Sequence, residues 1–559
     1  MNIHLSGALV AGLVLTAGAA RAVTPDCAGW DAAFFEIDGL EVVRSERISK
    51  GADLGGRAGV APADYCSVVG RIGHHTGIDG MDYAITFNLS LPDTWNGDFV
   101  HQFNGGIDGV NVPATGPLLS GDRTQTALGR GYAVVSSDAG HDGGAVRDAG
   151  FAGASRFGFD PVARRDYGYG AVAKLHPVAL AMVERAYGKA PGRVYGVGGS
   201  NGGRHAMVAA ARMPEAFDGL LIGYPAFSLP QSAIQRATDA KAFAAVNGDI
   251  RKSFSQDDMN VLSQGILDAC DALDGLADGL VQDTEACQTT FDITALQCTA
   301  GQNAGCLSPA QVTALAVSQA GTTTSAGQVI YPPGFWDPGM NSRNWRVFRV
   351  ESGDERGKLY PTFVTRGAAV LPQMFATPPI LSDGTPEGQL QFLLDFDVDR
   401  DSALIWATND AFPESAITMV TPPGADNPVM QEARDAGMKI ILIHGAADPI
   451  FSLGDTIGWY RKLDANNGDD AEAFVRLFAV PGMPHGAGGP SPDDFDFFSP
   501  LVDWVENGIA PEVVVAGVTE GNREGQAALG DVTRKLCLYP AVARYTGSDP
   551  SSADSFTCQ

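Results

Sequence analysis

Three short segments of this chain hold the residue types of a nucleophilic catalytic triad. Ser200 lies in Gly198-Gly199-Ser200-Asn201-Gly202, Asp448 lies in HGAADP, and His485 lies in PGMPHGAGG. A serine hydroxyl becomes a good nucleophile only when an imidazole, oriented by a carboxylate, removes its proton on a sharp and exposed turn. The segments therefore predict acyl transfer at Ser200, with His485 as general base and acid and Asp448 as its orienting carboxylate.

The elements that must position these residues can be read from the runs before them. A strand, a tight glycine turn and a helix form the context of a nucleophile elbow, and an Ala-rich, helix-compatible run follows Ser200 at 204–212. Each candidate follows a strand-like run: RVYGV at 193–197, KIILI at 439–443 and FVRLFAV at 474–480. The chain order Ser, Asp, His is that of α/β-hydrolases. We therefore predict an α/β fold of the α/β-hydrolase type.

Further elements are predicted from hydrophobic periodicity. The alternating run at 84–91 predicts a half-buried strand, and the runs at 98–103 and 132–136 predict two more. A helical pattern at 170–187 is interrupted by Pro177. A last helix is expected to open with Ser499 as N-cap and Pro500 at the first position, and to stop at Gly508.

Other residues compete for roles at the site. Asp138, with His141 nearby, also follows a strand, but it precedes the serine, against the usual order. Among the other histidines, His205 is interpreted as a helix-face residue and His444 as a support of the strand end. The oxyanion needs two preorganised donors, and we predict the backbone N–H of Asn201 and that of Gly106 or its neighbour Gly105.

Length, charge and the first residues bound the class of protein. A chain of 559 residues is too long for one ordinary core, so a large insertion or a second domain is expected. A formal net charge of -27 argues against nucleic acid as a partner. An apolar run that ends in Ala20-Arg21-Ala22 predicts a signal peptide at 1–22, hence export to the periplasm or beyond, with no membrane span after its removal.

Eight cysteines behind an export signal predict disulfides. They fall in local clusters, so neighbour pairing is the simplest scheme among the 105 that eight cysteines allow. That scheme joins Cys27 to Cys66, Cys270 to Cys287, Cys298 to Cys306, and Cys537 to Cys558.

The βα alternation is lost between the two halves of the catalytic pattern. We predict a lid domain at 227–425, inserted in a catalytic domain formed by 23–226 and 426–559. The lid contains a loop of three carboxylates separated by glycines, a pattern that suits Ca²⁺ as a structural ion, although a solvated acidic loop is the alternative. The predicted ligands are Asp271, Asp274 and Asp278 with the carbonyl oxygens of Leu276 and Leu280.

Taken together, these motifs resemble the tannase and feruloyl esterase family, which includes the mono(2-hydroxyethyl) terephthalate hydrolases. The resemblance covers nearly all of the mature chain and includes GYAVVSSDAGH at 131–141, the elbow, MPEAFDGLLIGYPA at 213–226, CDALDGLADG, LIHGAADP and RLFAVPGMPHGAGG. It implies the α/β-hydrolase fold, the roles given above to Ser200, Asp448 and His485, and a calcium-binding lid that shapes the substrate pocket.

The sequence departs from this family at two positions. The family usually has a disulfide between the residue before the serine and the residue after the histidine, and here these residues are Gly199 and Gly486. The remaining cysteines fit the family's other four pairs. We therefore expect packing alone to hold the serine and histidine loops, without a cross-link that typically contributes about 2–4 kcal/mol.

The resemblance implies a secreted serine carboxylesterase that hydrolyses esters of aromatic acids: feruloyl or related hydroxycinnamoyl esters first, then galloyl or terephthalate monoesters. A peptidase or amidase with the same triad, and a non-catalytic binding protein on a hydrolase scaffold, are the alternatives. Lid side chains that could contact substrate are Trp336, Trp345, Phe348, Phe363 and Phe375 for an aromatic ring, and Arg343, Arg346, Arg349 and Arg366 for a carboxylate. The sequence leaves the oligomeric state open.

Overall fold

A mixed β-sheet forms the centre of the computed structural model, which describes residues 27–302, 304–352 and 359–559. The predicted signal peptide at 1–22 lies outside the described residues. The nine strands of this sheet follow one another in space as β1 (Glu41–Ile48), β2 (Tyr65–Thr76), β3 (Asp82–Pro92), β5 (Ala133–Ser137), β4 (Phe99–Phe103), β6 (Val194–Gly199), β7 (Gly219–Gly223), β10 (Lys439–Gly445) and β11 (Val475–Val480).

The sheet has an antiparallel half and a parallel half. Strands β1, β2, β3 and β5 pair antiparallel, whereas β5, β4, β6, β7, β10 and β11 run parallel to one another. The carboxyl ends of parallel strands meet at one edge of a sheet, where loops commonly form ligand sites. The loops after β6, β10 and β11 carry Ser200, Asp448 and His485, so the topology brings the three predicted triad segments to the same edge.

Helices cover both faces of the parallel half. On one face, α16 (Phe498–Asn507) packs Phe498, Leu501 and Trp504 against the strands. On the other face, α4 (Asn201–Arg212) and α15 (Leu453–Asn466) pack against alternate residues of the same strands. The strands are buried on both faces, which explains the continuous apolar run of β10. The α/β-hydrolase fold predicted from the sequence is confirmed.

Two expected helix boundaries were wrong. Helix α3 spans Ala171–Tyr187 without interruption, because its apolar face packs against β2, β3 and β5 and this burial outweighs the loss at Pro177. Helix α16 starts at Phe498, with Phe497 as N-cap residue. The side chain of Asp496, not that of Ser499, accepts the first backbone N–H groups of α16.

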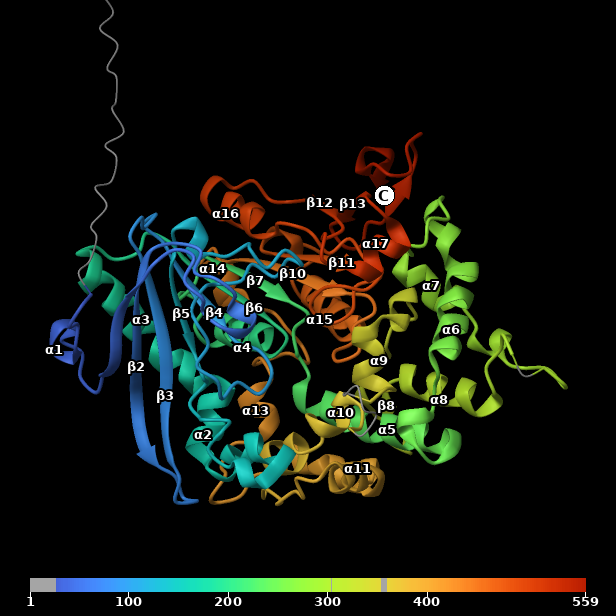
Figure 1. Ribbon diagram of the computed structural model, residues 1–559, viewed down its shortest axis with the longest axis horizontal. Helices are drawn as coiled ribbons and strands as arrows, with labels where there is room; N and C mark the ends of the chain where they lie inside the picture. The colour runs from blue at the N-terminus through green and yellow to red at the C-terminus, as the bar shows by residue number, and fades with distance from the viewer. Residues whose placement is uncertain (1–26, 303, 353–358) are drawn as a thin grey trace, which may run out of the picture.

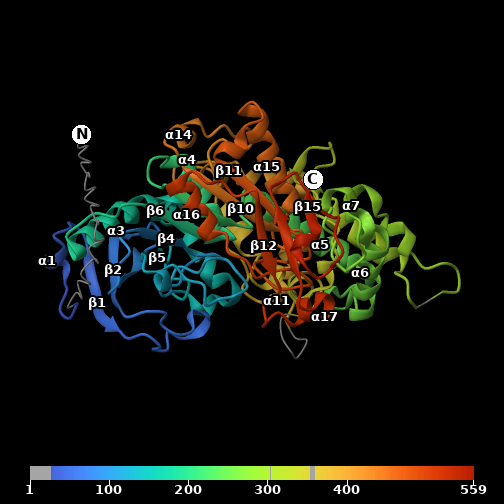
Figure 2. The same ribbon diagram turned by 90° about the horizontal axis from the view of Figure 1, so that it is seen from above.

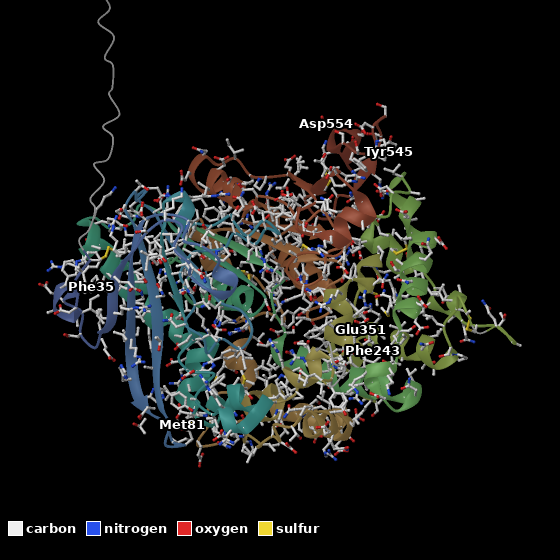
Figure 3. All side chains as sticks on the ribbon, viewed as in Figure 1. Phe35, Met81, Phe243, Glu351, Tyr545 and Asp554 are labelled. Carbon is white, nitrogen blue, oxygen red and sulfur yellow. A yellow bond between two sulfur atoms is a disulfide. The ribbon has the colours of Figure 1, made fainter. Side chains whose placement is uncertain are left out.

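Much of a helical region at 229–420 lies on the side of the molecule opposite β2 (Figures 1 and 2). Its elements are α5 (Leu229–Asn247), α6 (Gln256–Cys270), α7 (Thr284–Thr290), α8 (Pro309–Gln319), β8 (Thr322–Thr323), β9 (Val329–Tyr331), α9 (Arg343–Arg349), α10 (Thr362–Thr365), α11 (Pro386–Asp395), α12 (Val398–Asp401) and α13 (Ala416–Val420). Phe243 of α5 and Glu351 lie in this region, far from Phe35 of α1 (Ala32–Phe35), as Figure 3 shows.

The helical region shares one hydrophobic core with residues outside it. Phe243 and Phe363 belong to the same buried cluster as Phe157, Tyr167 and Phe451, which precede or follow the region in the chain. The segment with α2 (Pro161–Arg165) also contributes to this cluster. The predicted domain boundaries at 226–227 and 425–426 stay a prediction.

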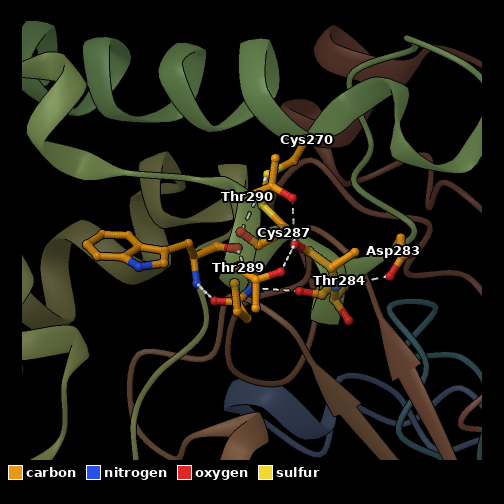
Figure 4. Close-up of a disulfide and its surroundings, with 9 residues drawn as sticks. Cys270, Asp283, Thr284, Cys287, Thr289 and Thr290 are labelled. Carbon is orange, nitrogen blue, oxygen red and sulfur yellow. Dashed lines mark hydrogen bonds between the residues drawn. A yellow bond between two sulfur atoms is a disulfide. The ribbon is translucent and has the colours of Figure 1, made fainter.

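The eight cysteines form four disulfides in the predicted neighbour pairing: Cys27–Cys66, Cys270–Cys287, Cys298–Cys306 and Cys537–Cys558. Figure 4 shows the second bridge, which joins the end of α6 to α7 across the acidic loop.

The C-terminal part adds α14 (Gln431–Asp435), α17 (Arg523–Leu529) and two small hairpins, β12 (Val513–Gly517) with β13 (Thr533–Cys537) and β14 (Ala543–Tyr545) with β15 (Phe556–Cys558). Among all described residues, none of the helices is both long and apolar enough to cross a membrane.

Candidate active site

Ser200 occupies a strained turn between β6 and α4. Its backbone has φ 62° and ψ −128°, a conformation that non-glycine residues rarely adopt. Glycines make the turn possible: a Cβ at position 198 would lie 2.5 Å from the carbonyl oxygen of Gly202, and a Cβ at position 202 would overlap the carbonyl oxygen of Phe103. The local backbone therefore has the form of a nucleophile elbow, with the serine at its apex.

Asp448 and His485 form a hydrogen-bonded pair at the same edge. Oδ2 of Asp448 lies 2.7 Å from Nδ1 of His485, and its other oxygen accepts the N–H groups of Ile450 and Phe451. The Asp448 side chain is fully buried, whereas that of His485 is partly exposed. Burial raises the pKa of Asp448, but the charge of His485 and hydrogen bonds from His444 and His485 outweigh burial and hold it well below its usual range. The carboxylate is thus kept ionised beside the imidazole.

Tyr224 connects the serine turn to the histidine loop. Its ring centroid lies 4.7 Å from that of His485, in an edge-to-face arrangement. On its other side the ring borders Gly199, where a Cβ would lie 2.6 Å from Cζ of Tyr224. The N–H of Ser200 donates to the carbonyl of Gly223, one residue before the tyrosine. Tyr224 therefore links the serine turn to the hydrogen-bonded pair of His485 and Asp448.

The predicted oxyanion donors lie on either side of the serine. Asn201 is the first residue of α4, where backbone N–H groups have no partner within the helix. Gly105 follows β4, and a Cβ on it would lie 3.8 Å from Cβ of Ser200. The next residue, Gly106, has φ +70°, which turns the loop sharply at this point. The two loops can present backbone donors to the same point beside Ser200.

A buried polar network lies behind these donors. The side-chain amide of Asn201 donates to Asp108 (2.5 Å), and its carbonyl oxygen accepts from Tyr167 (3.1 Å) and Arg204 (2.7 Å). His205 lies 3.3 Å from the Asp108 carboxylate. Burial raises the pKa of Asp108 to about 7, although the charges of Arg204 and His141 and the bond from Asn201 oppose the rise. The network fixes the loop of Gly106 to the start of α4.

Asp108 and Tyr224 were not predicted from the sequence as site residues. Each had a weak signal, since Asp108 closes the GGID segment after one strand and Tyr224 lies in GYPA after another. Neither sequence pattern predicts which side chains Asp108 and Tyr224 contact, because their partners, Asn201 and His485, are far away in the chain.

The competing acid, Asp138, serves a different purpose in the structure. Its carboxylate accepts the N–H groups of Thr86 and Gly140, and burial raises its pKa to about 7. The ring of His141 stacks on Phe157. Burial lowers the pKa of His141 to about 4. These contacts tie a loop to β3 and do not form an acid–base pair.

The other histidines also lie in the interior. His444 bonds to Thr456 (2.8 Å) and to the carbonyl of Phe451 (3.0 Å), which supports the end of β10. His205 is buried against Asp108, so its side of α4 faces the polar network and not solvent. Of the histidines considered, His485 is the one that both bonds to Asp448 and packs on Tyr224, the residue that borders the serine turn.

The three carboxylates of the predicted calcium loop bind backbone N–H groups of the same loop. Asp271 accepts the N–H groups of Asp278 and Gly279, and Asp278 also pairs with Arg534. Backbone N–H groups of Leu276 and Leu280 donate to Asp274 and Asp278. The second oxygen of Asp274 is buried without a donor.

Charge in this loop favours a cation. Burial, and then the charges of Asp278 and Asp271, raise the pKa of Asp274 to about 6. In the described parts of the chain, His, Cys, Asp and Glu side chains do not by themselves form a set of three metal ligands. An ion would therefore also need backbone oxygens, and the predicted set includes two. The orphaned oxygen of Asp274 and the hard oxygen donors fit Ca²⁺.

The lid side chains considered for substrate binding differ in burial and in their ion pairs. Trp345, Phe363 and Phe375 are buried core residues, and Trp336 and Phe348 pack against that core while still partly exposed. Arg346 pairs with Glu351 and Arg349 with Asp239, whereas Arg343 and Arg366 are exposed.

Comparisons with known proteins cover most of the chain. The family model "Tannase and feruloyl esterase" matches residues 66–559. Mono(2-hydroxyethyl) terephthalate hydrolase of Piscinibacter sakaiensis is 39% identical over 524 residues, which are 89% of this chain and 85% of that protein.

Solved structures show the same fold at lower identity. An esterase from Aspergillus oryzae superposes with a TM-score of 0.75 at 21% identity, covering 95% of this chain and 99% of that one. Feruloyl esterase B from Aspergillus oryzae gives 0.68 at 21% identity, covering 94% and 97%. The family model matches most of the chain, and the relative from Piscinibacter sakaiensis is 39% identical to it. The chain therefore belongs to the tannase and feruloyl esterase family and is a carboxylic ester hydrolase.

Proposed function

We propose that this enzyme hydrolyses esters of aromatic carboxylic acids through an acyl-enzyme on Ser200. The observation that carries the proposal is the hydrogen bond between Asp448 and His485, at the sheet edge where Ser200 occupies a nucleophile elbow. Substrates would be feruloyl or related hydroxycinnamoyl esters, galloyl esters or terephthalate monoesters. Support for the aromatic acyl group comes from the family and from the terephthalate ester named for the relative from Piscinibacter sakaiensis.

In the proposed reaction, Oγ of Ser200 attacks the ester carbonyl while Nε2 of His485 takes the hydroxyl proton. The Asp448 carboxylate accepts the Nδ1–H of the imidazole and stabilises the imidazolium that forms. Backbone N–H groups of Asn201 and Gly106 stabilise the oxyanion. His485 then returns the proton to the leaving alcohol, and a water molecule, deprotonated in turn by His485, releases the acid from the serine.

A substrate panel tests this proposal. Methyl ferulate, methyl gallate, a terephthalate monoester and a simple nitrophenyl ester are offered to the wild type and to Ser200→Ala. We expect turnover of at least one aromatic ester by the wild type, and a loss of several orders of magnitude in the variant. Turnover of none of them, or equal activity of the variant, would refute the proposal. An aromatic amide in the same panel tests the peptidase or amidase alternative.

We also propose that the acidic loop binds Ca²⁺ as a structural ion. Asp271, Asp274 and Asp278 would hold it together with the carbonyl oxygens of Leu276 and Leu280. The orphaned, buried oxygen of Asp274 supports this assignment. The loop belongs to the helical region, so the ion would stabilise that region and take no part in the reaction at Ser200.

We propose further that the protein is exported. The predicted signal peptide at 1–22 and the four disulfides support this, since disulfides persist mainly in oxidising compartments. Cleavage after Ala22 would be visible in the N-terminal sequence of the mature protein, and an uncleaved N-terminus would contradict it.

A further inference from the structure

Tyr224 has a backbone conformation that is unusual for a tyrosine. It follows β7 directly and has φ 36°, in the left-handed region that bulky residues rarely enter. Its N–H donates to the carbonyl of Ile443 in β10 at 2.6 Å, which fixes this backbone to the sheet. Such strain persists only where the surroundings impose it, and it is common at functional sites.

The strained backbone places the ring between two loops that the reaction needs. On one side, a Cβ at position 199 would overlap the hydroxyl oxygen of Tyr224 and lie 2.6 Å from its Cζ, far closer than side chains approach one another. On the other side, a Cβ at position 486 would lie 3.7 Å from the hydroxyl oxygen, at ordinary contact distance. The ring therefore fills the space between the residue before Ser200 and the residue after His485.

His485 packs against two aromatic rings. The Tyr224 ring meets it edge to face at 4.7 Å, and Phe451 meets it at 5.7 Å in a similar orientation. Asn344 of α9 donates to the backbone carbonyl of His485 at 3.1 Å. With Asp448 on Nδ1, the histidine is thus limited by its neighbours in rotation as well as in translation.

We propose that Tyr224 is a positioning residue for the reaction, a spacer whose ring sets the separation of the serine turn and the histidine loop and holds the imidazole against Asp448. The proposal rests on the proposed function, because it assigns Tyr224 a role in the same site. It also gives a steric reason for glycine at position 199, where any side chain would displace the ring.

The hydroxyl of Tyr224 stays neutral at ordinary pH. Burial and then the charge of Asp448 raise its pKa to about 12, against the opposing charge of Arg123. An ionised phenolate would compete with Asp448 for the charge of the imidazolium. A neutral side chain can pack beside the pair without changing its charge, so the proposed role depends on packing and not on ionisation of the hydroxyl.

A kinetic comparison of Tyr224→Leu, Tyr224→Phe and Tyr132→Leu tests the role. Tyr132 is a buried tyrosine at the start of β5, at the other end of the strands, and its substitution controls for a general loss of packing. We expect Tyr224→Leu to lower kcat about 10–100-fold with KM changed by only a few-fold, since a small misplacement of a reacting group has effects of this size. Tyr224→Phe should restore most of kcat, and Tyr132→Leu should lower Tm without this effect.

A double-mutant cycle tests the contact without using activity. Gly199→Ala should lower Tm strongly in the wild-type background and much less in the Tyr224→Leu background, because the leucine no longer fills the space that the methyl group needs. Equal destabilisation in both backgrounds would overturn the contact. An unchanged kcat in Tyr224→Leu would overturn the role. Failure of the proposed function is distinct, since it would appear as an inactive wild type.

Discussion

The side-chain amide of Asn201 donates a hydrogen bond to the carboxylate of Asp108, and this contact joins two loops that each offer an oxyanion donor. Asn201 follows the nucleophile directly, and Asp108 closes the turn that contains Gly106, with its own N–H bonded to the carbonyl of Gly105. Both side chains are buried. The separation of the two donors therefore depends on one buried hydrogen bond.

Removal of the Asp108 acceptor should damage catalysis more than substrate binding. Asp108 has φ 46°, a left-handed conformation that asparagine adopts more readily than alanine. We expect Asp108→Ala to lower kcat about 100-fold, comparable to the loss of one oxyanion donor, with KM within a few-fold of wild type. Asp108→Asn keeps an acceptor oxygen for Asn201 and should be much milder. A change confined to KM in Asp108→Ala would contradict this account.

Substitution of the two candidate acids, Asp448 and Asp138, should have very different effects on kcat. Asp448→Asn should lower kcat by about 10⁴-fold, because the amide favours the wrong tautomer of the histidine. Asp138→Asn should leave kcat within a few-fold, because the amide oxygen can still accept from Thr86 and Gly140. Steady-state kinetics of the two purified variants, with circular dichroism as a folding control, decide between them. A larger loss of kcat in Asp138→Asn than in Asp448→Asn would identify Asp138 as the acid of the triad.

Asp138 should also make stability depend on pH. Its pKa is raised to about 7 in the folded state, so the folded protein keeps a proton there that the unfolded chain loses near pH 4. The unfolded state thus binds fewer protons between about pH 4 and 7, and stability falls as pH rises through this window, by at most about 1.4 kcal/mol per pH unit. Below about pH 4 the protonated Asp138 carboxyl contributes its full stabilisation of the folded state, and above about pH 7 this stabilisation is lost.

Asp138→Asn removes the titrating carboxyl, so the Tm of the wild type and that of the variant should depend differently on pH. Thermal melts of wild type and variant at several pH values should show a wild-type Tm that declines relative to the variant as pH rises from 4 to 7. A constant difference in Tm across this range would show that the carboxyl does not stay protonated in the fold.

The sequence predicted the parts of the site that depend on local chemistry. Glycines around Ser200 and strand runs before Asp448 and His485 follow from the backbone that a nucleophile elbow and its parallel sheet require. The positions of β1, β2 and β7, on the other hand, were not predicted, and Pro177 was expected to break a helix that packing keeps intact. Tertiary burial outweighs local propensity in such cases.

The supporting contacts could not be predicted because they join distant segments. Asp108 and Asn201 are 93 positions apart, and their contact depends on how β4 and β6 pair in the sheet. Packing alone was expected to hold the serine and histidine loops in place of a cross-link between positions 199 and 486, but the sequence did not name the side chain. In the structure, Tyr224 lies between these two glycines.

Removal of calcium should destabilise the helical region. We expect a chelator to lower Tm, because Asp274 would then keep a buried carboxylate near those of Asp271 and Asp278 without the ion. In Asp274→Asn, which weakens the site, the chelator should have little further effect. Metal analysis of the untreated protein should find about one calcium per chain. An unchanged melt together with no bound metal would remove the ion from this account.

The central claim is that Ser200 is the nucleophile, and covalent trapping tests it most directly. The enzyme is treated with an aryl phosphonate that modifies activated serines, and the modified peptide is identified by mass spectrometry. We predict one adduct per chain on Ser200, formed in parallel with the loss of esterase activity and absent from His485→Ala on the same timescale. An adduct on another residue that tracks the loss of activity, with Ser200 unmodified, would contradict the claim.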